Sequence, residues 1–145
     1  MTAVAALLAV LAGLAGSIQV AVMGRFGERV GVVTALVFAT AIQLLLAAVL
    51  LLVTRRTAGI GESFRSPPWM WLGGLMGLIV VYSITFAQPR IGATTTIGIL
   101  IAGQLAMGAV IDRFGLFGVE ALPLSWPRIA GLVLLAAGAA LTLSR

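Results

Sequence analysis

Three glutamines are the residues of this sequence best suited to bind a polar solute, because each lies inside a long apolar run. At the rise of an α-helix, Gln43 sits roughly 16 Å and Gln104 roughly 18 Å into its run, so both approach the middle of a membrane. Gln19 lies nearer the end of its run. An amide in lipid is costly and tends to face a cavity or a neighbouring helix. We therefore expect these amides either to line a solute path or to bridge helices by hydrogen bonds.

Other polar side chains could extend such a path. Thr40 lies three residues before Gln43 and shares its helical face. Tyr82 and Ser83 fall in the deeper half of another apolar run, although core packing with a satisfied hydroxyl explains Tyr82 equally well. The candidates for substrate binding are Gln104, Gln43, Tyr82, Gln19, Thr40 and Ser83.

Charged residues are absent from the middle of the apolar runs. A proton-coupled cation exporter needs a buried acid, and only Asp112, at the end of a run, approximates one. Beside Arg113 it is better explained as a helix-end charge. Arg90 could attract an anion to the positive end of the helix that follows it, or anchor the chain to headgroups. Asp112 and Arg90 are thus candidates for gating or coupling, and the uncharged interior suits neutral, zwitterionic or weakly anionic solutes.

The composition requires a lipid environment and leaves few kinds of chemistry. The chain has 145 residues, of which 61% are hydrophobic and 9% charged, and its mean hydropathy is +1.20. This is too little polar surface to cover a water-soluble globule. The net charge of +5 comes from arginines that apolar runs separate, so we expect no nucleic-acid binding. With no Cys and no His, we expect no enzyme, no metal site and no cofactor.

The apolar runs predict an all-α integral membrane protein with five crossings in a single domain covering residues 1–145. The expected helices span about 3–22, 32–53, 69–87, 92–111 and 128–143. Between them we expect a polar connector from Met23 to Arg29, a break at Gln88-Pro89-Arg90, a helix end at Asp112-Arg113 and an interfacial segment over 114–127. A secretory signal competes for the first run, but that run lacks a basic start and is longer than an ordinary signal core.

The arginines do not define which way the chain inserts. With five crossings, five arginines lie on the same side of the membrane as the N-terminus: Arg55, Arg56, Arg65, Arg113 and Arg128. Four lie on the opposite side: Arg25, Arg29, Arg90 and Arg145. Five against four is too small a bias to orient the protein. One possibility is that the protein inserts in both orientations and that oppositely oriented copies pair. The other is that the first helix, or a partner protein, selects a single orientation. We recognise no internal repeat, so an inverted second copy would supply the symmetry that many transporters have.

Two glycines seven residues apart, Gly131 and Gly138, form a stripe of small residues on the last expected helix. Such a stripe permits close helix packing, either within the subunit or between two subunits.

Several stretches resemble a known family. The most specific is PRIGATTTIGILIAGQLAMGAVIDRFGLFG, from Pro89 to Gly118, and it is supported by 68–77 and 123–126. These stretches are similar to the YdcZ-like inner-membrane exporters of the drug/metabolite transporter superfamily. The resemblance implies five helices, export of a small solute across the bacterial inner membrane, and units that pair in opposite orientations. By analogy with small multidrug exporters of that superfamily, it also implies a dimer interface at Gly131 and Gly138.

Taken together, the sequence predicts a small secondary transporter that works by alternating access as an antiparallel homodimer embedded in the bilayer. A dual-topology dimeric channel is the first alternative, and a non-transporting accessory subunit is the second. A transporter shows exchange and saturation, whereas a channel conducts without counter-transport.

Overall fold

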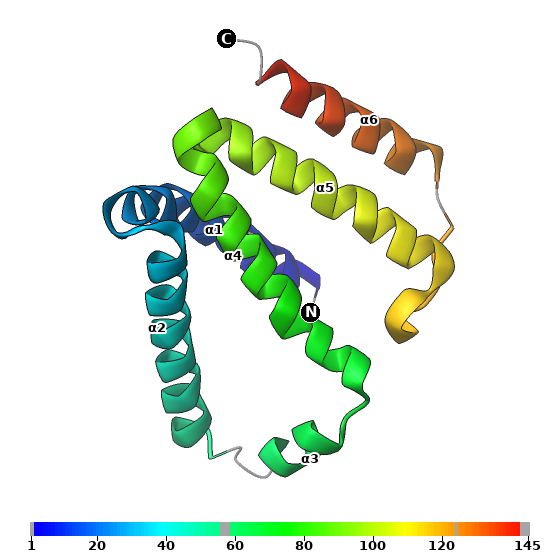
Figure 1. Cartoon of the computed structure of the whole chain (residues 1–145). Helices are drawn as coiled ribbons and strands as arrows, with labels where there is room; N and C mark the ends of the chain where they lie inside the picture. Colours follow the sequence, from blue (N-terminus) through cyan, green and yellow to red (C-terminus); the bar gives the residue numbers. More distant parts are fainter. Residues whose placement is uncertain (1, 56–58, 124, 143–145) are drawn as a thin grey trace. The chain divides into compact units, whose positions relative to one another are not determined.

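The computed structural model describes residues 2–55, 59–123 and 125–142, and every regular element in these ranges is a helix (Figure 1). Four helical segments are long and apolar enough to cross a membrane: Ala3–Val30, Val32–Val53, Pro68–Ile91 and Ala93–Phe114. The chain is therefore an all-α membrane protein with four spans of adequate length. Its contacts group into two compact units, residues 1–20 with 90–145 and residues 21–89, so the predicted single domain stays a prediction.

The first helix is longer than its apolar run. Helix α1 (Thr2–Val30) continues through Met23–Arg29, which corrects the expected polar connector. The polar residues there stabilise the helix, since Arg25 donates to Glu28 at 2.9 Å with the spacing of one helical turn. Only Gly31 separates α1 from α2 (Val32–Val53), whose bounds agree with the prediction.

The second long pair of helices is joined in the same way. Helix α4 (Leu72–Ile91) includes Gln88-Pro89-Arg90, so the expected break there is wrong. Proline is tolerated because it lies in the last turn, where it removes one hydrogen bond, that to the Thr85 carbonyl. The chain turns at Gly92, one residue later than α4 ends, and α5 (Ala93–Phe114) follows.

Helix α5 also runs past its expected end at Asp112-Arg113. It stops at Gly115, which has a left-handed conformation (φ 61°) and donates its N–H to the Ile111 carbonyl. Glycine is the residue that adopts this helix-ending conformation at least cost. The helix end is thus determined by glycine rather than by the charged pair.

Short helices occupy the connections. Helix α3 (Gly59–Arg65) and the 3-10 turn η1 (Pro68–Trp71) precede α4, and the Trp71 Nε1 donates to the Ser63 carbonyl at 3.3 Å. The turn η2 (Leu116–Gly118) follows α5. Within 114–123 and 125–127, which the structure describes, no candidate span begins, and Phe114 and Phe117 are exposed. The interfacial position of this segment stays a prediction.

Helix α6 (Trp126–Leu141) packs on α5 within their unit. The Thr95 hydroxyl donates to the Thr142 carbonyl at 2.9 Å, and a Cβ at Gly98 would lie 3.6 Å from the Ala139 Cα. At sixteen residues α6 is about 24 Å long, less than the hydrocarbon core of roughly 30 Å. The predicted fifth helix ended at Leu143, outside the described residues, so a fifth crossing is not established.

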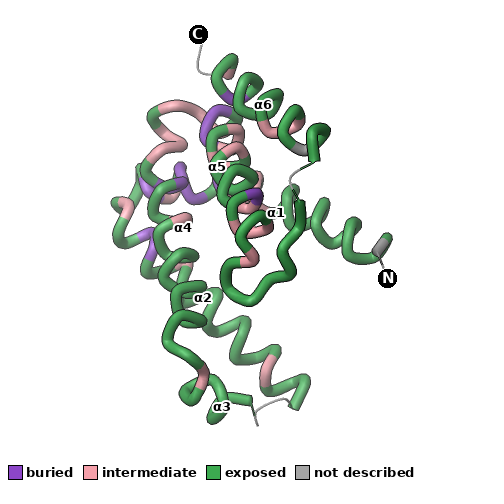
Figure 2. The backbone as a smooth tube through the Cα atoms, turned by 90° about the vertical axis from the view of Figure 1, so that its right-hand side faces the viewer, coloured by how far each residue is buried: buried purple, intermediate pink, exposed green. Residues whose placement is uncertain are grey.

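The unit of residues 21–89 has its own small core. Its buried side chains come from the end of α1, the start of α2 and the end of α4: Met23, Ala35, Leu36, Ile84 and Thr85. Most other residues along the helices are exposed (Figure 2). Exposed leucine, valine and isoleucine over whole helices are suited to lipid or to partner helices.

Candidate functional site

The amides of Gln43 and Gln104 are exposed on apolar helices. Gln43 belongs to α2 and Gln104 to α5, and neither forms a hydrogen bond with any residue that the structure describes. Burying an amide in an apolar environment without a partner costs roughly 2–7 kcal/mol. A cavity or another helix must therefore satisfy these groups in the membrane.

The remaining substrate-binding candidates are spread over both units. Thr40 is exposed one turn before Gln43, Ser83 is exposed on α4, and Gln19 is half-buried on α1. Tyr82 is 43% exposed and stacks on Phe86 with ring centroids 6.4 Å apart, so it is not a core residue of its unit. Gln19 and Gln104 belong to one unit and the other four candidates to the second, so a site shared by all six stays a prediction.

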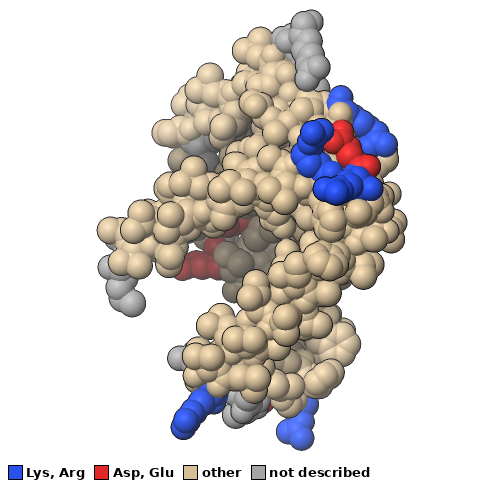
Figure 3. Space-filling view, turned by 90° about the vertical axis from the view of Figure 1, so that its left-hand side faces the viewer, with Lys and Arg blue, Asp and Glu red and all other residues tan. Residues whose placement is uncertain are grey.

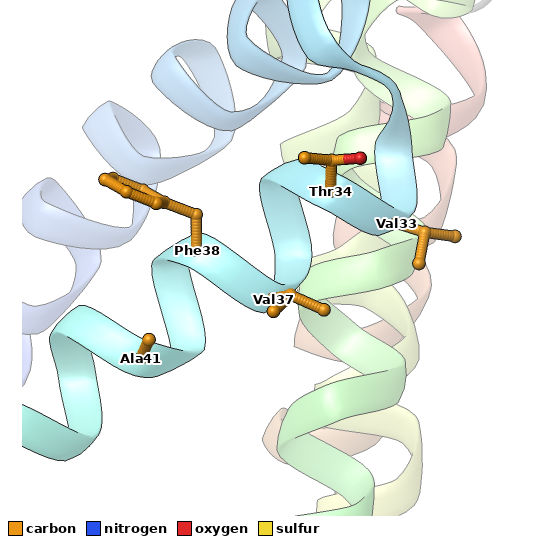
Figure 4. Close-up of a pocket in the computed structure, with 5 residues that line it drawn as sticks. All are labelled: Val33, Thr34, Val37, Phe38 and Ala41. Atoms are coloured by element: carbon orange, nitrogen blue, oxygen red, sulfur yellow. The ribbon is translucent and has the colours of Figure 1, made fainter.

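A groove lies along the first turns of α2, in the unit of residues 21–89 (Figure 4). Its volume is about 410 Å³, and its lining is apolar apart from one hydroxyl: Val33, Thr34, Val37, Phe38 and Ala41. None of these residues was a predicted site residue. Sequence reasoning missed the groove because a surface hollow depends on which side chains of a helix remain uncovered.

Gln88 is a second feature that the sequence concealed. Its Oε1 is inaccessible and has no hydrogen-bond partner among the residues that the structure describes. The side chain lies against Gly24, where a Cβ would be 2.9 Å from the Gln88 Cβ. The available signal was a glutamine beside a proline, which suggested a helix break. A buried, unpaired acceptor is rare in proteins and makes Gln88 a candidate functional residue.

The two charged candidates, Arg90 and Asp112, lie near the ends of their helices. Arg90 is exposed in the last turn of α4, and Asp112 is half-buried in the last turn of α5, where its carbonyl accepts from the Leu122 N–H at 2.8 Å. On the face drawn in Figure 3, charged side chains occupy small areas of a largely uncharged surface. Roles of Asp112 and Arg90 in gating or coupling remain predictions.

Both glycines of α6 are open within the described part of the chain. A Cβ at Gly131 or Gly138 would meet no atom within 4 Å, whereas α6 contacts α5 through Ala139 and Thr142. The glycine stripe is therefore not used for packing on α5.

Four helices long and apolar enough to cross a membrane are typical of a multi-pass membrane protein. The family model described as "Putative inner membrane exporter, YdcZ" matches residues 4–141, and the chain belongs to this family. It is a multi-pass protein of the inner membrane, and the predicted family resemblance is confirmed.

One curated relative is the Inner membrane protein YdcZ of Escherichia coli (strain K12). The two sequences are 39% identical over 89 residues, which is 61% of this chain and 59% of the relative. The chain thus spans about three fifths of the length of that relative. No solved structure matches the chain.

Proposed function

We propose that this chain is a secondary transporter that exports a small polar solute across the bacterial inner membrane by alternating access. The observation that carries the proposal is the exposed, unpaired amide of Gln104 on the apolar helix α5, together with that of Gln43 on α2. Membership in a family described as an inner-membrane exporter supports it. No enzymatic step is part of the proposal.

The solute binds through neutral hydrogen-bonding groups. Gln104 and Gln43 each offer a donor and an acceptor, and Tyr82, Ser83, Thr40 and Gln19 extend the path. Because no charged side chain lies in the middle of a span, neutral, zwitterionic or weakly anionic solutes fit better than organic cations. Arg90 and Asp112, at helix ends, serve gating or coupling.

The working unit is an antiparallel homodimer of five-crossing subunits. In each subunit α6 makes the fifth crossing, and a helix of about 24 Å spans by local thinning of the bilayer. The unbiased arginine distribution permits both orientations. The open stripe of Gly131 and Gly138 supports an interface on α6, because two helices approach closely where both lack side chains.

A dimeric channel is the competing function, since the same amides could line a continuous polar pore. Counterflow distinguishes the two, because only a carrier exchanges an internal solute for an external one. We would first find a ligand by thermal shift, using neutral amino acids and sugars as probes, because a ligand that binds the folded state raises its apparent stability. Purified protein in liposomes preloaded with that ligand should then show saturable counterflow, whereas non-saturating flux without exchange would favour a channel. Failure to transport any stabilising ligand would favour an accessory subunit.

A further inference from the structure

Helices α1 and α4 are matching members of an internal repeat. Each is followed by a single glycine in a backbone region that is almost restricted to that residue, with φ 88° and ψ 147° at Gly31 and φ 83° and ψ 160° at Gly92. Aligning the sequence on these two glycines matches 13–50 with 74–111 without a gap. The clearest identities pair GLAGSIQV with GLMGLIVV, RVGVVT with RIGATT, and AIQL with AGQL. The expectation of no internal repeat is therefore corrected: α1–α2 and α4–α5 are two versions of one helical hairpin.

The last turns of α1 and α4 cross through matching positions of this repeat. Gly24 lies against Gln88, and Gly27 lies against Thr85. Gly24 matches Thr85 in the alignment and Gly27 matches Gln88, so both contacts join the same two positions of the hairpin. Two copies of one element that are related by a two-fold axis make such a reciprocal contact. The helices therefore meet as equivalent partners, and the glycines of α1 leave room for the larger side chains of α4.

The larger side chains bring polar atoms that the closed contact does not satisfy. The Gln88 Oε1 is inaccessible and has no hydrogen-bond partner among the described residues. The Thr85 carbonyl oxygen lies 3.4 Å from the place of a Cβ at Gly27, and it cannot receive the helical hydrogen bond from Pro89, which has no N–H. A buried acceptor without a donor lowers the stability of the state that contains it. A movement that admits water to Gln88 therefore recovers part of this free energy.

A small apolar core holds the crossing closed. The buried hydrophobic side chains described in the unit of residues 21–89 are Met23, Ala35, Leu36 and Ile84, and the two glycines add no side chain to them. Separating the two helix ends therefore exposes little apolar surface. Regions with few buried apolar contacts are the ones that open most readily in a folded protein.

We infer that the crossing of α1 and α4 is a gate of the proposed transporter, closed in this structure, and that Gln88 is its gating residue. The inference rests on the alternating access of the proposed function. When the last turns of the two helices separate, the Gln88 amide becomes accessible to water and to a polar solute. The unpaired acceptor makes opening easier, because it destabilises the closed state alone. The glycine turn after each helix takes up the change of angle, as hinge residues do.

Thiol labelling measures the opening, since the chain has no cysteine of its own. Thr85 is fully buried, so Thr85→Cys should react with N-ethylmaleimide only when the crossing is open. In liposomes we expect complete labelling, at least about tenfold slower than that of Arg29→Cys, because a minor open state holds roughly 0.1–10% of the molecules. Arg29 is the control because it is exposed at the end of α1.

A second substitution separates a gating role of Gln88 from a structural one. Gln88→Leu removes the unpaired acceptor from the closed state, so it should slow the labelling of Thr85→Cys about tenfold more. Loss of a purely structural contact would instead loosen the crossing and speed the labelling. Faster labelling with Gln88→Leu, or no labelling of Thr85→Cys at all, would overturn the gate.

A disulfide across the crossing connects the gate to transport and leaves Gln88 in place. A Cβ at Gly27 would lie 2.6 Å from the Thr85 Cγ2, hence within about 4 Å of the Thr85 Cβ, as a disulfide requires. Oxidised Gly27→Cys/Thr85→Cys should lose counterflow of the neutral amino acid or sugar that stabilises the protein, and regain it on reduction. The control is Gly98→Cys/Ala139→Cys between α5 and α6, where the two Cβ atoms are 3.7 Å apart, and it should transport when oxidised.

The outcomes separate the gate from the transporter. Full counterflow by oxidised Gly27→Cys/Thr85→Cys would overturn the gate and leave the proposed transporter intact. Equal loss in the oxidised control would also count against the gate, because the loss would not depend on this crossing. No counterflow by the wild-type protein would overturn the proposed function, and the gate with it.

Discussion

Thr85 occupies the space that a side chain at Gly27 would need. A Cβ at Gly27 would lie 2.6 Å from the Thr85 Cγ2 and 3.4 Å from the Thr85 carbonyl oxygen. Thr85 is fully buried, and its hydroxyl donates to the Val81 carbonyl at 2.6 Å, which fixes its rotamer. The end of α1 therefore packs on the end of α4, and a side chain added at Gly27 would clash with the Thr85 side chain, which is held in place.

Gly27→Ala should destabilise the protein by about 1–3 kcal/mol, because it overpacks this contact. Gly77→Ala is the matched control in the same unit, since a Cβ there meets no atom within 4 Å, and it should be neutral or stabilising. Thermal unfolding in detergent, followed by circular dichroism, measures both. Equal stability of the two variants would show that α1 and α4 do not touch at Gly27.

Gly92→Ala should lower the free energy of unfolding by about 1–3 kcal/mol for a different reason. An alanine at φ 83° and ψ 160° is strained. Gly103→Ala is the control, because Gly103 lies in the middle of α5 with open space around it, and it should not lower the free energy of unfolding. Chemical unfolding of both variants in mixed micelles would compare them. A Gly92→Ala protein as stable as wild type would mean that the turn is not confined to glycine.

Tags on the C-terminus should report both orientations of the wild-type protein in membranes, because the arginine bias is a single charge. Adding two or three lysines to one set of connections should shift the population to one orientation. Accessibility of the tag to a protease from each side of the membrane measures the ratio. A single wild-type orientation without an oppositely oriented partner would contradict the homodimer.

Gly138→Leu should weaken dimerisation, since the bulk of leucine keeps two α6 helices from close approach. Ala140→Leu, which is exposed on the opposite side of α6, is the control and should dimerise normally. The yield of chemically crosslinked dimer in bilayers gives the comparison. If Gly138→Leu and Gly131→Leu both dimerise like wild type, the interface belongs to another helix.

Apolar length predicted the helices better than it predicted where they end. The predicted bounds of α2 were right, because the helix begins directly after Gly31 and ends where its apolar run ends, at Val53. At Arg25–Arg29 and at Pro89 the polarity pattern predicted breaks between helices, but α1 and α4 continue through these residues. Helices α1 and α4 each end before a glycine with positive φ, Gly31 and Gly92. The sequence does not distinguish these two glycines from its others.

The sequence predicts candidate binding residues by their chemistry, and their role in binding stays a prediction, but it does not predict what surrounds them. Gln43 and Gln104 could be found because amides are rare in apolar runs. The burial of the Gln88 Oε1 could not be found, because it depends on α4 crossing Gly24 on a distant part of the chain.

Counterflow by Gln104→Leu in liposomes tests most directly whether an amide on α5 binds the solute. Leucine is nearly isosteric and better solvated by lipid, so the variant should insert and dimerise like wild type, as should the control Met107→Leu on the same helix. The loss of one neutral hydrogen bond is worth about 0.5–1.5 kcal/mol, up to about tenfold in affinity, and a dimer loses two such groups. We predict that Gln104→Leu loses most or all counterflow while Met107→Leu keeps it. Normal counterflow by Gln104→Leu, accompanied by unstable dimers, would show instead that this amide holds helices together.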